Sequence, residues 1–229
     1  LAQVDSSIGG KTGVDFRAYK NMVGAFHQPE LVYMNISALK SLSRRQFNSG
    51  LGEILKHGLI KDALYFEWLR DNSDKIAALD VQVLEEMIYR SCEIKRAVVE
   101  NDPTEKGERA LLNFGHTLGH AIEKQKNFEL YHGECVVLGM IAALRICVER
   151  GMISEEEFSD ICSAFRTYDF PVNTDGITVD SVIAASKNDK KMDAGRVKFI
   201  LLKKIGEAYI DMTVDDDTMR RALETVVTE

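Results

Sequence analysis

The sequence has little of the features that mark disulfide-rich, membrane-spanning or secreted proteins. Its 229 residues include only four cysteines, three prolines and one tryptophan. The cysteines lie apart in apolar or helical segments, which is typical of reduced thiols and predicts a cytoplasmic protein. No apolar run approaches the roughly 20 residues that span a bilayer, and the first residues do not form a secretory leader.

Positive charge is also scarce. The chain has 29 Lys and Arg against 36 Asp and Glu, a formal net charge of -7. Nucleic acids and anionic membranes attract basic surfaces, so we expect neither as a partner. The 45% hydrophobic and 28% charged contents are those of an ordinary globular protein with one large domain or two modest ones.

The chain has no initiator methionine and begins with LAQVDSSIGGKTGV. Residues 1–4 predict the end of a strand, and residues 5–13 predict a loop in which paired glycines allow tight turns. The sequence Gly10-Lys11-Thr12 is not a nucleotide P-loop, because Asp5 stands where that motif has its first glycine. We expect the sequence to be a piece of a longer protein.

Residues 111–140 hold three of the five histidines in an apolar setting. His116 and His120 are four residues apart, which places both rings on one face of a helix. A polar segment at 124–129 could reverse the chain and bring His132 beside them. Three histidines would suffice for a zinc-type site with an open position, and glycines beside each histidine admit a close ligand. The alternative is a surface coincidence or a buried histidine that only makes a structural hydrogen bond.

A second polar cluster lies in the helix predicted at 47–69. Glu53, Lys56 and His57 share one face of it, as either a functional group or a solvated edge. The helix predicted at 81–100 places Lys95 on or beside its buried face, where a lysine needs an anionic partner or a water-filled cleft.

The remaining pattern is mainly helical. We predict an extended segment at 28–35, a helical run at 37–42 and helices at 135–150, 155–167, 180–186 and 217–227. Ser154 and Glu157 form a capping box for the helix predicted at 155–167. Segments 196–202 and 207–210 alternate around Gly206 as in a β-hairpin.

With these segments in order, the chain resembles the C-terminal two-thirds of the 3-dehydroquinate synthase family. The motifs that carry the resemblance are AQVDSSIGGKTGV, KNMVGAF, SGLGEILKHGLI, LLNFGHTLGHAIE, YHGECVVLGM, and NDKK followed by LLKKIGEA. The resemblance implies a mainly α fold: a helical metal- and substrate-binding domain at 43–229 with a small β-hairpin, preceded at 1–42 by the remnant of an α/β NAD-binding domain. The Gly-rich pyrophosphate loop of that domain is missing, so we expect weak NAD binding and little turnover by this chain alone.

The resemblance also implies the roles of individual residues. In place of the three-histidine set, it implies a zinc site that consists of Glu53, His116 and His132. Co²⁺ could replace zinc in this site. The residues implied in catalysis or substrate binding are His120, Lys56, Lys95, Arg109, Asn113, Asn21, Asp5 and Lys191, with Lys190 as the alternative to Lys191. The residues implied at the NAD site are Lys11, Lys20, Ala38, Leu39, Lys40 and Ser41.

The implied reaction converts 3-deoxy-D-arabino-heptulosonate 7-phosphate to 3-dehydroquinate and phosphate, in the shikimate pathway to aromatic amino acids, by a homodimer. A related sugar-phosphate cyclase is one alternative, although Lys95, Arg109 and Asn113 favour a substrate with a carboxylate. The other alternative is a catalytically silent helical domain for dimerisation or metal storage.

Overall fold

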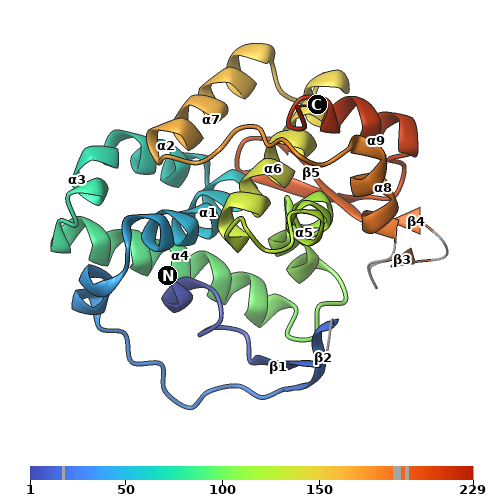
Figure 1. Cartoon of the computed structure of the whole chain (residues 1–229). Coiled ribbons are helices and arrows are strands. Elements are labelled where there is room, and N and C mark those ends of the chain that lie inside the picture. Colours follow the sequence, from blue (N-terminus) through green and yellow to red (C-terminus); the bar gives the residue numbers. More distant parts are fainter. Residues whose placement is uncertain (17–18, 188–191, 194–195, 229) are drawn as a thin grey trace.

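The chain folds as a mainly helical protein, as the sequence predicts (Figure 1). The structure is a computed structural model that describes residues 1–16, 19–187, 192–193 and 196–228. The α-helices are α1 (Arg44–Lys61), α2 (Ala63–Asp71), α3 (Ser73–Ala77), α4 (Val81–Asn101), α5 (His116–Gln125), α6 (His132–Glu149), α7 (Glu155–Thr167), α8 (Val179–Lys187) and α9 (Asp216–Leu223). Short 3₁₀ helices occupy Ala2–Val4, Ile36–Ser41 and Glu108–Asn113.

Strands form three separate antiparallel pairs in the described part of the chain. They are β1 (Lys11–Phe16) with β2 (Tyr19–Phe26), β3 (Met192–Asp193) with β4 (Arg196–Val197), and β5 (Phe199–Lys204) with β6 (Glu207–Asp211). The hairpin predicted around Gly206 is β5–β6, and Gly206 has the positive φ of +85° that its turn requires.

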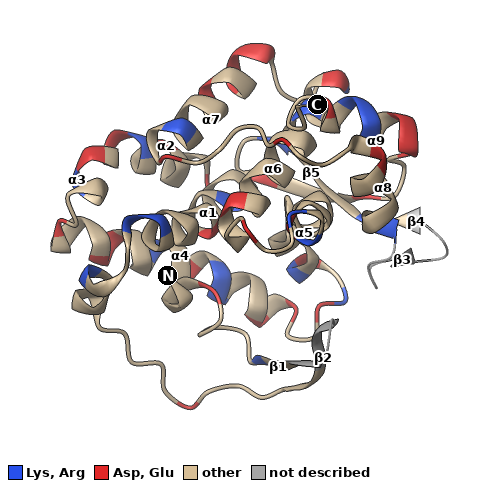
Figure 2. Cartoon of the chain, viewed as in Figure 1, with Lys and Arg blue, Asp and Glu red and all other residues tan. Residues whose placement is uncertain are grey.

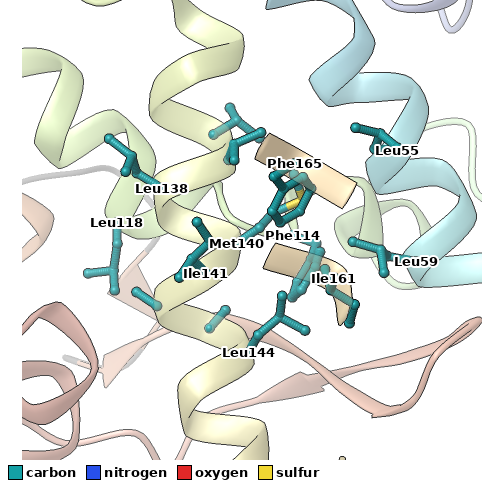
Figure 3. Close-up of a cluster of buried hydrophobic side chains, with 14 of the residues drawn as sticks. Leu55, Leu59, Phe114, Leu118, Leu138, Met140, Ile141, Leu144, Ile161 and Phe165 are labelled. Carbon is teal, nitrogen blue, oxygen red and sulfur yellow. The ribbon is translucent and has the colours of Figure 1, made fainter. Parts of the chain in front are cut away.

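Helix α6 is the centre of the core. It is apolar almost all round, and it packs against α1, α5, α7, α9 and β5. Figure 3 shows Leu138, Met140 and Leu144 of α6 between Leu59 of α1 and Leu118 of α5. The first residue of α6 is His132, so the packing of this helix in the core sets the position of the His132 backbone.

The packing of α5 on α6 depends on glycine. A Cβ atom at Gly139 would lie 1.9 Å from the backbone oxygen of Gly115 and 2.6 Å from the nitrogen of Gly119. The two helix backbones therefore meet directly, and the start of α5 is brought against α6.

Helix ends follow the sequence signals for capping and charge. Ser154 and Glu157 form the predicted capping box of α7. Acidic residues occupy the first turns of α7 and α9, where their negative charges interact favourably with the positive end of the helix dipole (Figure 2).

Several details differ from the sequence expectations, among them the start of strand β1 at Lys11 within the loop predicted at 5–13. Residues 1–4 are not a strand end, because Ala2–Val4 forms a 3₁₀ helix. The helix predicted at 47–69 breaks at Asp62, whose carboxylate accepts a hydrogen bond from the Tyr65 backbone N–H and caps α2. The last helix ends at Leu223, after which Val227 bridges to Thr174. The strand predicted from 196 begins at Phe199, because Arg196 and Val197 pair with β3.

Candidate metal centre and substrate cavity

Three helices bring one carboxylate and two imidazoles together. Glu53 lies in α1, His116 is the first residue of α5, and His132 is the first residue of α6. The Glu53 Oε1 atom lies 3.6 Å from His116 Nε2 and 3.7 Å from His132 Nε2. Gly115 precedes His116 with a φ of +78°, so the chain turns sharply and enters α5 with the histidine directed at Glu53.

The donor set fits a zinc ion. Nitrogen and oxygen ligands about 2.0–2.1 Å from a tetrahedral zinc lie roughly 3.4 Å from each other. The two distances from Glu53 are close to that value. Glu53 Oε1 is also buried without a hydrogen-bond partner among the described residues, a costly state that a cation would relieve.

His120 remains beside this cluster. Its ring centroid lies 5.1 Å from that of His116 and 5.6 Å from that of His132. Ligand atoms of the three histidines lie within 4.8 Å of one another, so the set derived from spacing alone is also brought together. The geometry of Glu53 favours Glu53, His116 and His132 as ligands, with His120 facing the same space.

Opposite charges hold the Glu53 carboxylate ionised. Burial favours its neutral form, but the ammonium group of Lys56 and the rings of His132 and His116 outweigh this and hold the pKa of Glu53 well below its ordinary value. Lys56 is itself only 2% exposed and forms an ion pair with Glu53. For His132, burial lowers the pKa, but the carboxylates of Glu123 and Glu53 outweigh it and raise the pKa to about 9. Both shifts favour positive charge beside the Glu53 carboxylate.

A cavity of about 640 Å³ lies next to Glu53, His116 and His132, which form part of its lining. Ten of the residues singled out in the sequence line it: Asp5, Lys11, Glu53, Lys56, Lys95, Arg109, Asn113, His116, His120 and His132. Residues from the N-terminal segment, α1, α4, the 3₁₀ helix at Glu108–Asn113 and the starts of α5 and α6 thus share one hollow.

Hydrogen bonds hold two basic side chains of the cavity, Lys95 and Arg109. Lys95 Nζ lies 2.7 Å from Asp5 Oδ1, which is the anionic partner that its buried position requires. Burial lowers the pKa of Lys95, and Asp5 partly offsets this shift. The Arg109 guanidinium donates to the backbone oxygens of Gly9 (2.7 Å) and Pro103 (2.8 Å). Its charge is therefore not cancelled by these partners.

Two glutamates of this region were not singled out in the sequence. Glu105 accepts a hydrogen bond from Asn113 Nδ2 at 2.7 Å and forms an ion pair with Lys11. Glu123 is 5% exposed, and its Oε2 atom lies 3.8 Å from His132 Nδ1. The spacing of Glu123, three residues after His120 on the same helix, was the available signal for its position.

Other candidate residues are not placed at the cavity. Ala38, Leu39, Lys40 and Ser41 lie in the 3₁₀ helix at Ile36–Ser41 and are not among its described lining residues. The backbones of Lys20 and Asn21 lie in β2, and their side chains are outside the described part. Lys190 and Lys191 lie outside the described residues. The assignment of these residues to a cofactor or substrate stays a prediction.

His57 does not face the cluster with Glu53 and Lys56. It is 1% exposed, and its Nδ1 atom lies 2.7 Å from Ser91 Oγ of α4. Burial, reinforced by the charge of Lys56, holds the pKa of His57 well below its ordinary value. His57 is therefore buried between α1 and α4, and its face of α1 is not the solvated edge that the sequence left open.

Comparison with known proteins agrees with the geometry. The family model for the C-terminal part of 3-dehydroquinate synthase matches residues 50–192, and the model for the N-terminal part matches residues 1–49. The chain belongs to the 3-dehydroquinate synthase family. A 3-dehydroquinate synthase of Acetivibrio thermocellus is 45% identical over 99% of this chain, and one of Ruminiclostridium cellulolyticum is 42% identical over 97%. The chain spans 63% and 62% of the lengths of these two relatives.

Solved structures of two cyclases are also similar to this member of the 3-dehydroquinate synthase family. A 2-epi-5-epi-valiolone synthase from Streptomyces hygroscopicus, with NAD+ and Zn²⁺ bound, is 29% identical with a TM-score of 0.90. A 2-deoxy-scyllo-inosose synthase, complexed with carbaglucose-6-phosphate, NAD+ and Co²⁺, is 26% identical with a TM-score of 0.84. Both comparisons cover 98% of this chain, and 63% and 65% of the respective solved chains. No described helix of this chain is long and apolar enough to cross a membrane.

Proposed function

We propose that this chain supplies the metal- and substrate-binding part of a 3-dehydroquinate synthase. The reaction eliminates phosphate from 3-deoxy-D-arabino-heptulosonate 7-phosphate and closes the ring of 3-dehydroquinate. The observation that carries the proposal is the position of Glu53 Oε1. This buried oxygen lies between two imidazoles without a hydrogen-bond partner among the described residues, and it borders a cavity lined by several lysines and an arginine. The names and identities of the curated relatives, 39–45%, support this substrate over those of the less similar solved cyclases.

Glu53, His116 and His132 would hold the zinc ion, with Co²⁺ as an alternative. NAD would supply reversible hydride transfer, and zinc would polarise the hydroxyl group that is oxidised. Once Glu53 binds a metal, Lys56 loses part of its counter-charge and can attract the substrate. His120, which lines the same cavity, would move a proton to or from the bound sugar.

The charge of the cavity suits a doubly anionic substrate. Its lining contains the cations Lys11, Lys56, Lys95 and Arg109 and the acids Asp5, Glu53 and Glu105. Four positive and three negative side chains leave one positive charge, to which a zinc ion would add two. We expect the phosphate and the carboxylate of the substrate to compete with Asp5 and Glu105 for these cations.

A cyclase for a substrate without a carboxylate is the second candidate. It would share the metal centre, but it would have no use for the combined donors Lys95, Arg109 and Asn113. Parallel phosphate-release assays with the heptulosonate phosphate and with a carboxylate-free sugar phosphate separate the two substrates. Faster release from the second compound would overturn our assignment.

The metal centre is tested first by the metal content of the purified chain. We expect one zinc per chain, lost in Glu53→Ala and kept in Lys187→Ala, a surface variant outside the cavity. Phosphate release is then measured with NAD present, on the chain alone and joined to the remaining part of the Acetivibrio thermocellus relative. Absence of zinc from every sample would support the silent helical domain instead.

The family resemblance also suggests a homodimer in the cytoplasm. The described structure is a single chain whose four cysteines are all free thiols, in keeping with a reducing compartment. Light scattering coupled to size exclusion at several protein concentrations tests the dimer, and a mass of one chain at all of them would exclude it.

A further inference from the structure

Glu123 lies behind one of the candidate metal ligands. The His132 ring stands between two carboxylates: Nε2 is 3.7 Å from Glu53 Oε1, and Nδ1 is 3.8 Å from Glu123 Oε2. Glu123 comes from α5 and His132 from α6, so the contact crosses between the two helices. The side chain of Glu123 is only 7% exposed.

His116 has a corresponding arrangement. Its Nδ1 atom lies 3.1 Å from the backbone oxygen of Phe114, while its Nε2 atom faces Glu53. Both imidazoles therefore present Nε2 to the same point and turn Nδ1 toward an oxygen acceptor. The acceptor behind His116 is a neutral carbonyl of the backbone, whereas the one behind His132 is a carboxylate.

The difference matches the exposure of the two rings. The side chain of His116 is 12% exposed and that of His132 is 40% exposed. A ring that opens to solvent is less confined by packing, so its orientation depends more on a polar partner. A carboxylate that accepts the Nδ1–H bond fixes the tautomer of a histidine ligand and makes its Nε2 a stronger donor to a metal.

We infer that Glu123 is a positioning residue that orients His132 and thereby sets the metal affinity of the centre. The inference rests on the metal centre of the proposed function. It adds a residue that is not among the described lining residues of the substrate cavity and that lies against the ligand His132.

A second hollow gives access to this pair from another side. A cavity of about 370 Å³ is lined by Gln46, Ser49, Glu123, Phe128, Leu130, Tyr131 and His132. Removal of the Glu123 carboxylate would therefore leave a space next to Nδ1 that small carboxylic acids can reach. This allows a test by chemical rescue.

The first experiment compares zinc affinities by competition with a chromophoric chelator. We expect Glu123→Gln to bind zinc about 10–100-fold more weakly than the native chain, the usual effect of losing such a partner. The matched control is Glu134→Gln. Glu134 is a glutamate of similar burial on α6 that pairs with Arg45 and accepts a hydrogen bond from the Tyr131 backbone N–H. A glutamine keeps an oxygen for this cap of α6, so the variant should lower stability and leave the zinc affinity unchanged.

The second experiment adds acetate to Glu123→Ala. We expect acetate to restore part of the lost zinc affinity and to have no effect on the native chain or on Glu134→Gln. A purely structural role of Glu123 would not give this rescue. Unchanged zinc affinity in Glu123→Gln would overturn the inference while leaving the metal centre intact.

Long-range ¹⁵N NMR of the native zinc-loaded chain gives a test that needs no variant. We expect His132 to carry its proton on Nδ1 and to bind zinc through Nε2. Zinc bound through Nδ1 would overturn the inference even if the variants do not fold. A native chain without zinc affinity would overturn both the inference and the proposed metal centre, whereas zinc binding without phosphate release would count against the proposed reaction alone.

Discussion

At the scale of single residues, the two carboxylate oxygens of Glu53 have different neighbours. Its Oε2 atom forms the ion pair with buried Lys56, and its Oε1 atom faces His116 and His132. A carboxylate held ionised by a lysine is ready to bind a metal without first losing a proton, because its pKa lies well below its ordinary value. The same lysine then becomes available to an anionic substrate.

His57 provides a pH-dependent prediction at this scale. Its pKa is held well below the ordinary value of 6.5, so the folded chain keeps it neutral while the unfolded chain binds a proton as the pH falls below 6.5. Proton uptake by the unfolded state lowers the free energy of unfolding by about 1.4 kcal/mol for each pH unit in that window.

We therefore expect the native chain to lose stability relative to His57→Gln as the pH falls from 6.5 to about 5. Urea denaturation of both proteins at several pH values, with metal removed, measures the difference in the free energy of unfolding. Parallel pH profiles would show that His57 is protonated in the folded state. The interpretation of α1 and α4 as joined by a neutral histidine would then be wrong.

At the scale of elements, the α5–α6 pair determines where the histidines lie. Gly139→Ala would place a methyl group against the backbone of Gly115 and Gly119, and backbone atoms cannot move aside as a flexible side chain can. We expect a loss of about 1–3 kcal/mol or more in the free energy of unfolding, together with weaker zinc binding as His116 is displaced.

The control for this variant is Gly107→Ala. Among the residues that the structure describes, a Cβ atom at Gly107 would meet only Asp102 Oδ2, at 3.9 Å, so we expect little change in stability. Urea denaturation and chelator competition compare both variants with the native chain. Native zinc affinity in a folded Gly139→Ala would show that the contact between α5 and α6 does not position the ligands.

The elements that sequence could predict were those with regular periodicity and a clear cap. Helix α4, the capping box of α7 and the β5–β6 hairpin are of this kind. The break at Asp62 was missed because the apolar spacing continues through it. The β1–β2 hairpin was missed because the side chains that the structure describes in it, at 11–14 and 23–26, are exposed and do not alternate against a core.

The site could be predicted only in part for a related reason. Spacing along one helix finds pairs such as His116 and His120, and these do lie together. Glu53 comes from a distant helix, and only the resemblance to a family suggested it as a ligand. The spacing on α5 places Glu123 near His120, but its approach to His132 on α6 crosses between helices, and the contact of Glu105 with Asn113 crosses between segments. No periodicity within one segment reveals such contacts.

At the scale of the whole molecule, a metal bound by α1, α5 and α6 would link three parts of the core. A ligand that binds only the folded state, at about 1000 times its Kd, adds about 4 kcal/mol to the free energy of unfolding. For a chain of this size we expect zinc to raise the Tm by roughly 8–16 °C.

Thermal unfolding with excess zinc and with EDTA measures this shift. Glu53→Ala should unfold at the same temperature under both conditions. Equal Tm values for the native chain with and without zinc would contradict a centre that joins the three helices.

The unequal exposure of the two imidazoles has a kinetic consequence. Glu53 and His116 are enclosed, whereas His132 opens to solvent at 40% exposure and borders two hollows. An incoming chelator can attack an ion from the open flank while the buried donors stay fixed. We therefore expect small chelators to accelerate isotopic zinc exchange, and we expect this exchange to proceed without global unfolding. The ion would then be exchangeable, unlike a permanently enclosed structural zinc.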